Sequence, residues 1–222
     1  MYVLVIGGRK KADYLVGSLL RKHHHVTVIN DDREYCKYLS RRHEVPVLWG
    51  DASKLYVYEA ADMEAISIVI ALTPNDADNL VICQLIKKNF DVTKAVAMAN
   101  NPRNVDVFKK LGVDIVVNST YIVGDMIEQL ATLEEIINYL PLEEGRVSLT
   151  EIDIKADYPV VNKKLTDIDL ADEANIGCIM RGVDVVIPNN NTVIMVNDRL
   201  IILAKPTVQN KVITTITGKI RS

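Results

Sequence analysis

Cysteines, aromatic residues and long apolar runs are all scarce in this sequence. Only 3 of its 222 residues are cysteines, and aromatic residues make up 5%. Cys36, Cys83 and Cys178 lie far apart, which predicts no disulfide framework and is typical of a reducing compartment. The longest apolar run, 66–72, is far shorter than the roughly 18 residues of a membrane span. The N-terminus enters a strand pattern directly, so we expect neither a signal peptide nor direct membrane insertion.

A catalytic or metal-binding set is missing as well. Three of the four histidines, His23, His24 and His25, are adjacent in an extended segment, where neighbouring side chains point apart. No nucleophile motif or pair of carboxylates stands out in the second half of the chain. The net charge is −3 with both signs interspersed, which gives no sign of nucleic-acid binding. We therefore predict no enzyme, no metal site and no nucleic-acid partner.

What the first half does contain is a regular alternation of strand and helix patterns. Hydrophobic residues make up 49% of the chain, enough for a sizeable core. Six short apolar runs are separated by stretches with apolar residues three and four apart. These runs are 2–6, 26–29, 45–49, 66–72, 94–98 and 113–117. The alternation predicts an α/β fold: a Rossmann-like parallel sheet with helices on both faces and a ligand crevice at the carboxyl ends of its strands.

The second half has a different texture. A helical pattern over 121–139 ends at Pro141, and short strand patterns separated by turn residues follow it. These features predict a small α+β C-terminal domain. We expect an N-terminal domain over 1–140, which includes the helix 121–139, and a C-terminal domain over 141–222.

The turn after the first strand is the first candidate binding element. Its sequence, Gly7-Gly8-Arg9-Lys10-Lys11-Ala12, follows a dinucleotide fingerprint except that Arg9 stands at the second glycine position. That glycine normally lets backbone amides approach a pyrophosphate. Arg9, Lys10 and Lys11 supply charge for a phosphate, and the helix start favours anions. A solvated basic helix start explains the same residues equally well.

Polar residues follow three further strands of the predicted sheet. Asn30 and Asp31 end the second strand, about 20 residues after the glycines, where a carboxylate usually binds ribose. Helix capping is the alternative role for these residues. The ends of the third and fourth strands carry Asp51-Ala52-Ser53 and Thr73-Pro74-Asn75-Asp76. Turns and caps explain each group alone, but their placement at successive strand ends favours a ligand crevice.

The order of these motifs resembles one known family. Gly50-Asp51-Ala52-Ser53, Thr73-Pro74-Asn75-Asp76 with Asn79, and Asn101-Pro102-Arg103-Asn104 are similar to the N-terminal domain of Trk/Ktr potassium-uptake regulators, the RCK domain. The second half resembles the RCK C-terminal domain. The matching segments there are 164–169, 179–182, 186–188 and 197–202.

The resemblance implies a cytoplasmic regulatory subunit rather than an enzyme. It would bind an adenine nucleotide (ATP, ADP or AMP) or NAD(H) and join a homo- or hetero-oligomeric gating ring of RCK subunits. The ring would lie on the cytoplasmic face of the membrane through a Trk/Ktr-type potassium transporter. The helix 121–139 would then cross over to a neighbouring subunit.

The sequence departs from the family at three nucleotide contacts. Arg9 replaces a glycine, Asn30 replaces the usual ribose acid, and Met98 stands where many relatives have an arginine. These changes favour altered nucleotide contacts over the ordinary NAD-binding mode. Two alternatives are an NAD(P)-dependent oxidoreductase, which rests on the Rossmann-like half alone, and a cyclic-dinucleotide sensor acting through the C-terminal domain.

Overall fold

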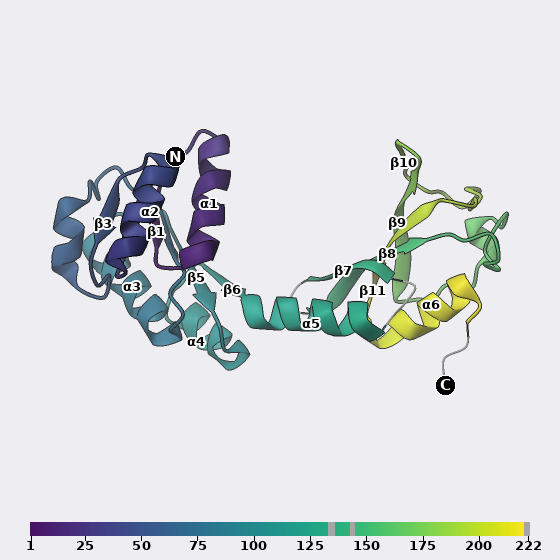
Figure 1. Cartoon of the computed structure of the whole chain (residues 1–222). Coiled ribbons are helices and arrows are strands. Elements are labelled where there is room, and N and C mark those ends of the chain that lie inside the picture. The colour runs from purple at the N-terminus through teal and green to yellow at the C-terminus, as the bar shows by residue number, and fades with distance from the viewer. Residues whose placement is uncertain (133–135, 143–144, 220–222) are drawn as a thin grey trace. The chain divides into compact units, whose positions relative to one another are not determined.

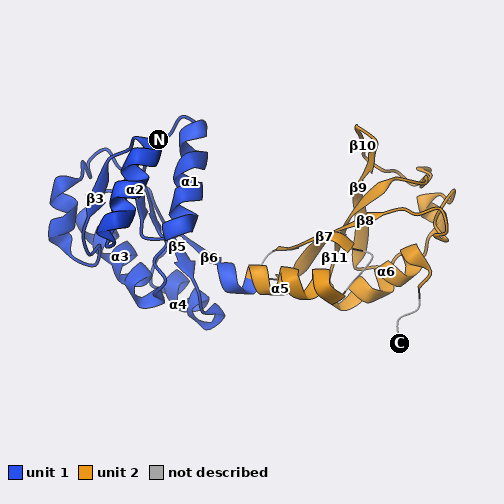
Figure 2. Cartoon of the chain, viewed as in Figure 1, with its two compact units in different colours: residues 1–121 blue, residues 122–222 orange. Residues whose placement is uncertain are grey.

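The computed structural model describes residues 1–132, 136–142 and 145–219 and divides the chain into two compact units, Met1–Tyr121 and Ile122–Ser222 (Figure 2). The first unit is an open parallel sheet with strand order β3-β2-β1-β4-β5-β6. Its strands are β1 (Tyr2–Ile6), β2 (His25–Asn30), β3 (Val47–Trp49), β4 (Ile68–Ala71), β5 (Lys94–Ala99) and β6 (Ile115–Asn118). Six helices lie between them: α1 (Arg9–Arg21), α2 (Arg33–His43), the 3-10 helices η1 (Leu55–Ala60) and η2 (Pro102–Asn104), α3 (Asp76–Asn89) and α4 (Val105–Lys110).

Alternation along β1 places side chains in two different cores. Val3 and Val5 pack with residues of α1 and α2, among them Val16 and Leu39. Leu4 and Ile6 pack on the other face with residues of η1, α3 and α4. Because successive strand residues point to opposite faces, a continuous apolar strand must be covered by helices on both sides. The predicted Rossmann-like architecture is therefore confirmed (Figure 1).

The second unit is built on an antiparallel sheet with strand order β10-β9-β11-β8-β7. Its strands are β7 (Ile136–Leu142), β8 (Val147–Asp153), β9 (Ala174–Arg181), β10 (Asp184–Val186) and β11 (Arg199–Ala204). The helix α6 (Gln209–Thr217) packs Val212, Ile213 and Ile216 into the same core. This arrangement confirms the predicted small α+β domain.

The helix predicted over 121–139 is too long. The helix α5 covers Ser119–Thr132, residues 133–135 lie outside the described part of the chain, and the strand β7 already begins at Ile136. Apolar residues at helical spacing continue through 136–137, but pairing with β8 makes this segment a strand. Pro141 is compatible with this strand because β7 lies at the edge of the sheet, where proline is tolerated. The two compact units divide at 121/122, and the domain boundary at 140/141 stays a prediction.

Two further expectations for the second half differ from the structure. The segment 192–196, one of the short strand patterns of the second half, forms only an isolated bridge in the described residues, between Lys164 and Val193. The tail after Pro206 contains the helix α6, which its sequence pattern did not predict. The turn at Asn197 agrees with the sequence: this residue has a φ of 67°, a conformation that asparagine tolerates better than most residues.

Candidate nucleotide-binding pocket

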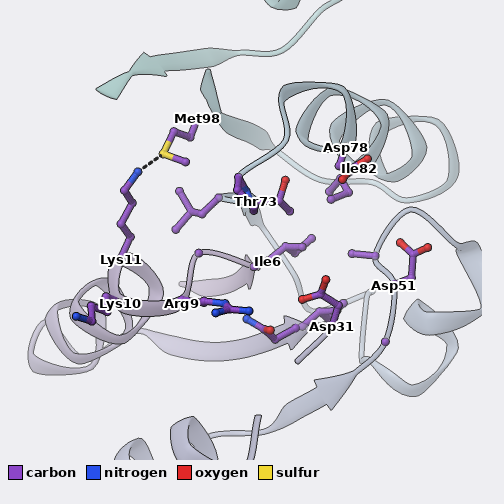
Figure 3. A pocket seen from close by; sticks show the side chains of 18 residues that line it. Ile6, Arg9, Lys10, Lys11, Asp31, Asp51, Thr73, Asp78, Ile82 and Met98 are labelled. Atoms are coloured by element: carbon purple, nitrogen blue, oxygen red, sulfur yellow. Dashed lines mark hydrogen bonds between the residues drawn. The ribbon is translucent and has the colours of Figure 1, made fainter. Parts of the chain in front are cut away.

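A cavity of about 520 Å³ lies at the carboxyl ends of the strands in the first unit (Figure 3). Most of its lining comes from the turns after β1, β2, β3 and β4 and from the end of β5. In this sheet β1 and β4 are hydrogen-bonded neighbours, so the chain reverses direction across the sheet between them. Ligands of open α/β sheets bind at this kind of switch point. The volume is in the range that small-molecule sites occupy.

Twelve of the fifteen residues predicted from the sequence line this cavity. They are Gly7, Gly8, Arg9, Lys10, Lys11, Asn30, Asp31, Asp51, Ala52, Thr73, Pro74 and Met98. The structure therefore brings four separate turns and the end of β5 together, as the parallel topology requires. Sequence reasoning missed the apolar walls, Ile6, Ile29, Leu72 and Ile82, and the polar residue Asp78 in the first turn of α3. Gly50, the first residue of the motif Gly50-Asp51-Ala52-Ser53, also lines the cavity.

The three remaining predicted residues hold the scaffold instead. The Asn75 side chain caps α3 by accepting a hydrogen bond from the Ala77 amide at 2.8 Å. Asp76 accepts hydrogen bonds from Asn100, Asn101 and Asn104, and so joins α3 to the segment after β5. Burial opposes its ionisation, but these hydrogen bonds outweigh it and lower the pKa of Asp76.

Ser53 is the third of these scaffold residues. Its amide donates to Asp51 Oδ1 at 2.9 Å. The hydrogen bonds from the Ser53 amide and side chain lower the pKa of Asp51 and keep this pocket carboxylate ionised.

The glycine turn is built by a run of left-handed backbone. Gly7 and Gly8 have φ values of 69° and 85°, and Arg9 continues the run at 36°. Arg9 thus occupies a conformation that a glycine adopts at lower cost, so the turn keeps its left-handed shape although the residue at this position is not a glycine. A Cβ on Gly8 would lie 2.7 Å from Leu72 Cβ, so this glycine also allows the turns after β1 and β4 to touch.

The Arg9 side chain extends from this turn toward the end of β2 (Figure 3). Its Nη2 lies 3.3 Å from Asp32 Oδ2, and its side chain is 74% exposed. Asp32 also caps α2 by accepting from the Glu34 and Tyr35 amides. An ion pair this exposed contributes little stability, so Arg9 remains available to a ligand anion.

Asn30 lines the pocket and has an unsatisfied donor in its side chain. The residue is 2% exposed, and its Oδ1 accepts the Asp32 amide at 2.9 Å. Its Nδ2 is buried and has no hydrogen-bond partner among the described residues. Leaving a buried donor unpaired costs about 1–3 kcal/mol, and a ligand oxygen would recover that energy. Unlike a carboxylate at this position, Nδ2 can only donate.

The opposite wall is fixed by Asn79, which is fully buried on α3. Its side chain accepts from the Thr73 amide at 2.8 Å and donates to the Met98 carbonyl at 2.8 Å. These bonds join the turn after β4 to the end of β5. Close by, Lys11 Nζ reaches across from α1 and lies 2.9 Å from Met98 Sδ.

Charges in the pocket are segregated. Arg9, Lys10 and Lys11 lie on the turn after β1 and the start of α1. Asp31 and Asp51 face the cavity from the ends of β2 and β3 (Figure 3). The start of α1 has no acidic residue in its first turn and no side-chain cap, so its amides and positive dipole add to the cationic side. Such an arrangement suits a ligand with phosphates at one end and hydroxyl or amine donors at the other.

The fold and pocket define a class of protein: a Rossmann-like nucleotide-binding type of domain joined to a small α+β domain. Family models agree with both halves of the chain. The TrkA-N domain model matches residues 3–119 and the TrkA-C domain model matches residues 149–216. The chain therefore belongs to the TrkA family.

Individual relatives match along almost the whole chain. A Trk system potassium uptake protein TrkA homolog from Methanothermobacter thermautotrophicus is 26% identical over 205 residues, covering 92% of this chain and 94% of the relative. The Trk system potassium uptake protein TrkA of Mycobacterium tuberculosis is 28% identical over 209 residues, covering 92% of this chain and 93% of the relative.

Solved structures with the same fold include the GsuK channel bound to NAD, with a TM-score of 0.66 and 16% identity. This chain is covered completely in that comparison but spans only 40% of the GsuK chain. The structure of GsuK bound to ADP aligns over 60% of this chain and 35% of its own, with a TM-score of 0.54 and 22% identity. These similarities establish the fold.

Proposed function

We propose that this protein is a regulatory subunit of a potassium-uptake system and binds an adenine nucleotide or NAD(H) in the pocket of its first unit. The observation that carries the proposal is the pairing of TrkA-N and TrkA-C domains along the chain. Relatives of nearly the same length are named as potassium-uptake proteins. RCK structures of the same fold are described with NAD or ADP bound.

The fifteen residues predicted from the sequence divide into two roles under this proposal. The twelve that line the pocket contact the nucleotide, with Arg9, Lys10 and Lys11 on the phosphate side. Ser53, Asn75 and Asp76 hold the turns that present those contacts. No hydride-transfer chemistry is assigned to the pocket, because the TrkA family is regulatory and we propose a switch instead of an enzyme.

Assembly into a homo- or hetero-oligomeric ring of RCK subunits is part of the same proposal. The helix α5 carries an apolar stripe of Val123, Ile127 and Leu130, which are 53%, 63% and 39% exposed. This spacing places the three side chains on one helix face. We propose that α5 packs against a second copy and is the element that crosses between subunits.

The membrane partner would be a Trk/Ktr-type transporter that holds the ring at the cytoplasmic face. No helix in the described residues is long and apolar enough to span a bilayer. A nucleotide regulates such an assembly only if it binds two ring conformations with different affinities.

Potassium uptake in cells tests the function directly. The chain would be expressed with a Trk-type membrane subunit in cells that lack their own uptake systems, with and without Asp51→Asn. We expect uptake to need both subunits and the chain to co-purify with the transporter. Uptake that is unchanged when this chain is omitted, together with no co-purification, would contradict the proposal.

A further inference from the structure

Lys11 and Met98 line the pocket and are in contact with each other. Lys11 starts on the first turn of α1, extends past the glycine turn and ends 2.9 Å from the sulfur of Met98 on β5 (Figure 3). In the sheet order, β2 and β3 lie on one side of the β1–β4 boundary and β5 lies on the other. A dinucleotide bound at such a boundary places one nucleoside on each side. Its second nucleoside would therefore have to cross the Lys11–Met98 contact.

The Lys11 ammonium has no anionic partner in the described part of the chain. Its hydrogen-bond acceptor in this structure is the thioether of Met98, and thioether sulfur is a weak acceptor. A phosphate in its place would form a charge-assisted hydrogen bond, which is about twice as strong as a neutral one. The terminal phosphate of a nucleoside di- or triphosphate is bonded to the rest of the ligand on one side only and carries about −1.5 to −2 charge at pH 7. Each phosphate of a dinucleotide is bonded on two sides, to a ribose and to the other phosphate, and carries less charge. Lys11 thus favours a phosphate chain that ends beside it.

Asn30 supplies an independent indication of a ligand, on the β2 side of the pocket. This side chain is 2% exposed, lines the cavity and leaves Nδ2 without a partner. A ribose hydroxyl can accept a hydrogen bond from Nδ2 and donate one to the nearby Asp31 carboxylate. Asn30 Nδ2 is thus a free donor for the sugar, and Lys11 Nζ is a donor for a phosphate. They lie on the two sides of the glycine turn and match the two ends of a single nucleotide.

We infer that this pocket takes a nucleoside di- or triphosphate with one nucleoside, whose last phosphate lies between the start of α1 and Lys11, and that the Lys11–Met98 contact disfavours a dinucleotide. The inference rests on the proposed nucleotide binding and specifies which of the proposed nucleotides the pocket prefers. Lys11 and Met98 act as specificity residues: the first provides the charge that ends the phosphate chain, and the second fills the space beyond it.

Calorimetric titration of the full-length protein with ADP, AMP, adenosine and NAD⁺ tests the inference. One charge-assisted hydrogen bond corresponds to about a tenfold change in affinity. We expect ADP to bind about tenfold or more tightly than both adenosine and NAD⁺. Trp49, the single tryptophan, gives a second readout because its Nε1 donates to the carbonyl of Asp31 in the pocket wall.

Two substitutions of Lys11 separate the effect of its charge from the effect of the space that its side chain fills. Lys11→Ala removes both, so ADP affinity should fall about tenfold while NAD⁺ affinity rises or stays constant, and the preference disappears. Lys11→Met keeps the length without the charge, so ADP should weaken equally while NAD⁺ remains excluded. Lys22→Ala, at the other end of α1, removes the same charge far from the pocket and should leave every affinity unchanged. Thermal melts establish that each variant is folded.

The outcomes are distinguishable. If NAD⁺ binds as tightly as ADP, or if Lys11→Ala leaves their affinity ratio unchanged, the inference is overturned while nucleotide binding stands. Adenosine binding as tightly as ADP also overturns it, because the phosphates would then make no contribution. If none of the four compounds binds, both the inference and the nucleotide-binding part of the proposed function fail.

Discussion

At the scale of single residues, a glycine can be needed for two different reasons: a left-handed backbone or a lack of room for a Cβ. Gly8 needs a left-handed backbone and also has no room for a Cβ, which would lie 2.7 Å from Leu72 Cβ. Gly112 has nearly the same φ, 83°, but a Cβ there would meet nothing within 4 Å. The pair therefore separates the cost of backbone conformation from the cost of a steric clash.

We predict that Gly112→Ala destabilises the protein by about 1 kcal/mol, the usual cost of a left-handed conformation. Gly8→Ala should cost about 2–4 kcal/mol, since overpacking adds to the same conformational term. Urea unfolding followed by circular dichroism measures both values. Equal costs for the two substitutions would show that the contact with the turn after β4 relaxes freely.

A buried ion pair makes a second prediction at this scale. The Asp198 side chain is 1% exposed and accepts from Arg181 Nε, Arg181 Nη2 and the Met195 amide, each at 2.8 Å. Burial opposes ionisation of this carboxyl, but the hydrogen bonds and the charge of Arg181 outweigh burial and lower the pKa of Asp198. Its contribution to stability is present above the unfolded pKa near 4 and is lost as pH falls through the folded pKa.

Asp198→Asn should therefore lower the unfolding free energy at pH 7 by about 2–3 kcal/mol and make it less sensitive to pH below about 4. Asp153→Asn is the matched control, because Asp153 pairs with Arg199 at 2.8 Å but is half exposed. That change should cost less than about 1 kcal/mol. Chemical unfolding at pH 7 and pH 3 compares the two variants. A cost for Asp198→Asn no larger than the control's would contradict this account.

At the scale of elements, α5 is a helix whose apolar stripe is left open. Ile127 is 63% exposed in the middle of that stripe. We predict that Ile127→Asp shifts the protein toward monomer at micromolar concentration, because a buried charge would disrupt an apolar interface. Analytical ultracentrifugation measures the shift, with Glu128→Ala on the same helix as the control. A wild-type protein that is already monomeric, or a variant that associates normally, would remove α5 from the interface.

The sequence predicts helices and strands whose pattern of apolar residues is sufficient to define them. It does not predict elements that form only through contacts with segments far away in the chain. The six strands of the first sheet follow from apolar runs alone, because both faces of each strand are buried. The strand β7 was read as helix, because only its pairing with β8 makes it a strand. In the pocket, turn residues such as Asp51 were found by their position, whereas Ile82 and Asp78 enter the lining only because α3 packs beside β5.

At the scale of the whole molecule, two units with separate cores share one chain. The pocket lies entirely in the first unit. A ligand stabilises only the part that it binds in its folded form. We expect scanning calorimetry to show two transitions and saturating ADP to raise only one of them. Asp198→Asn should lower the other. A single transition that shifts as a whole with ADP would mean that the two units unfold together.

The close contact between the turns after β1 and β4 determines which pocket residues can change during evolution. Gly7 and Gly8 are required by the neighbouring Leu72 and Thr73 even when the pocket holds nothing. A copy of this gene that had stopped responding to nucleotides would therefore still keep both glycines. The side chains of Arg9 and Lys11 are exposed, so packing does not constrain them. We expect substitutions to accumulate at these two positions first. Copies that no longer respond to nucleotides should therefore be recognised by the loss of Arg9 and Lys11. The two glycines do not distinguish such copies, because the fold itself requires them.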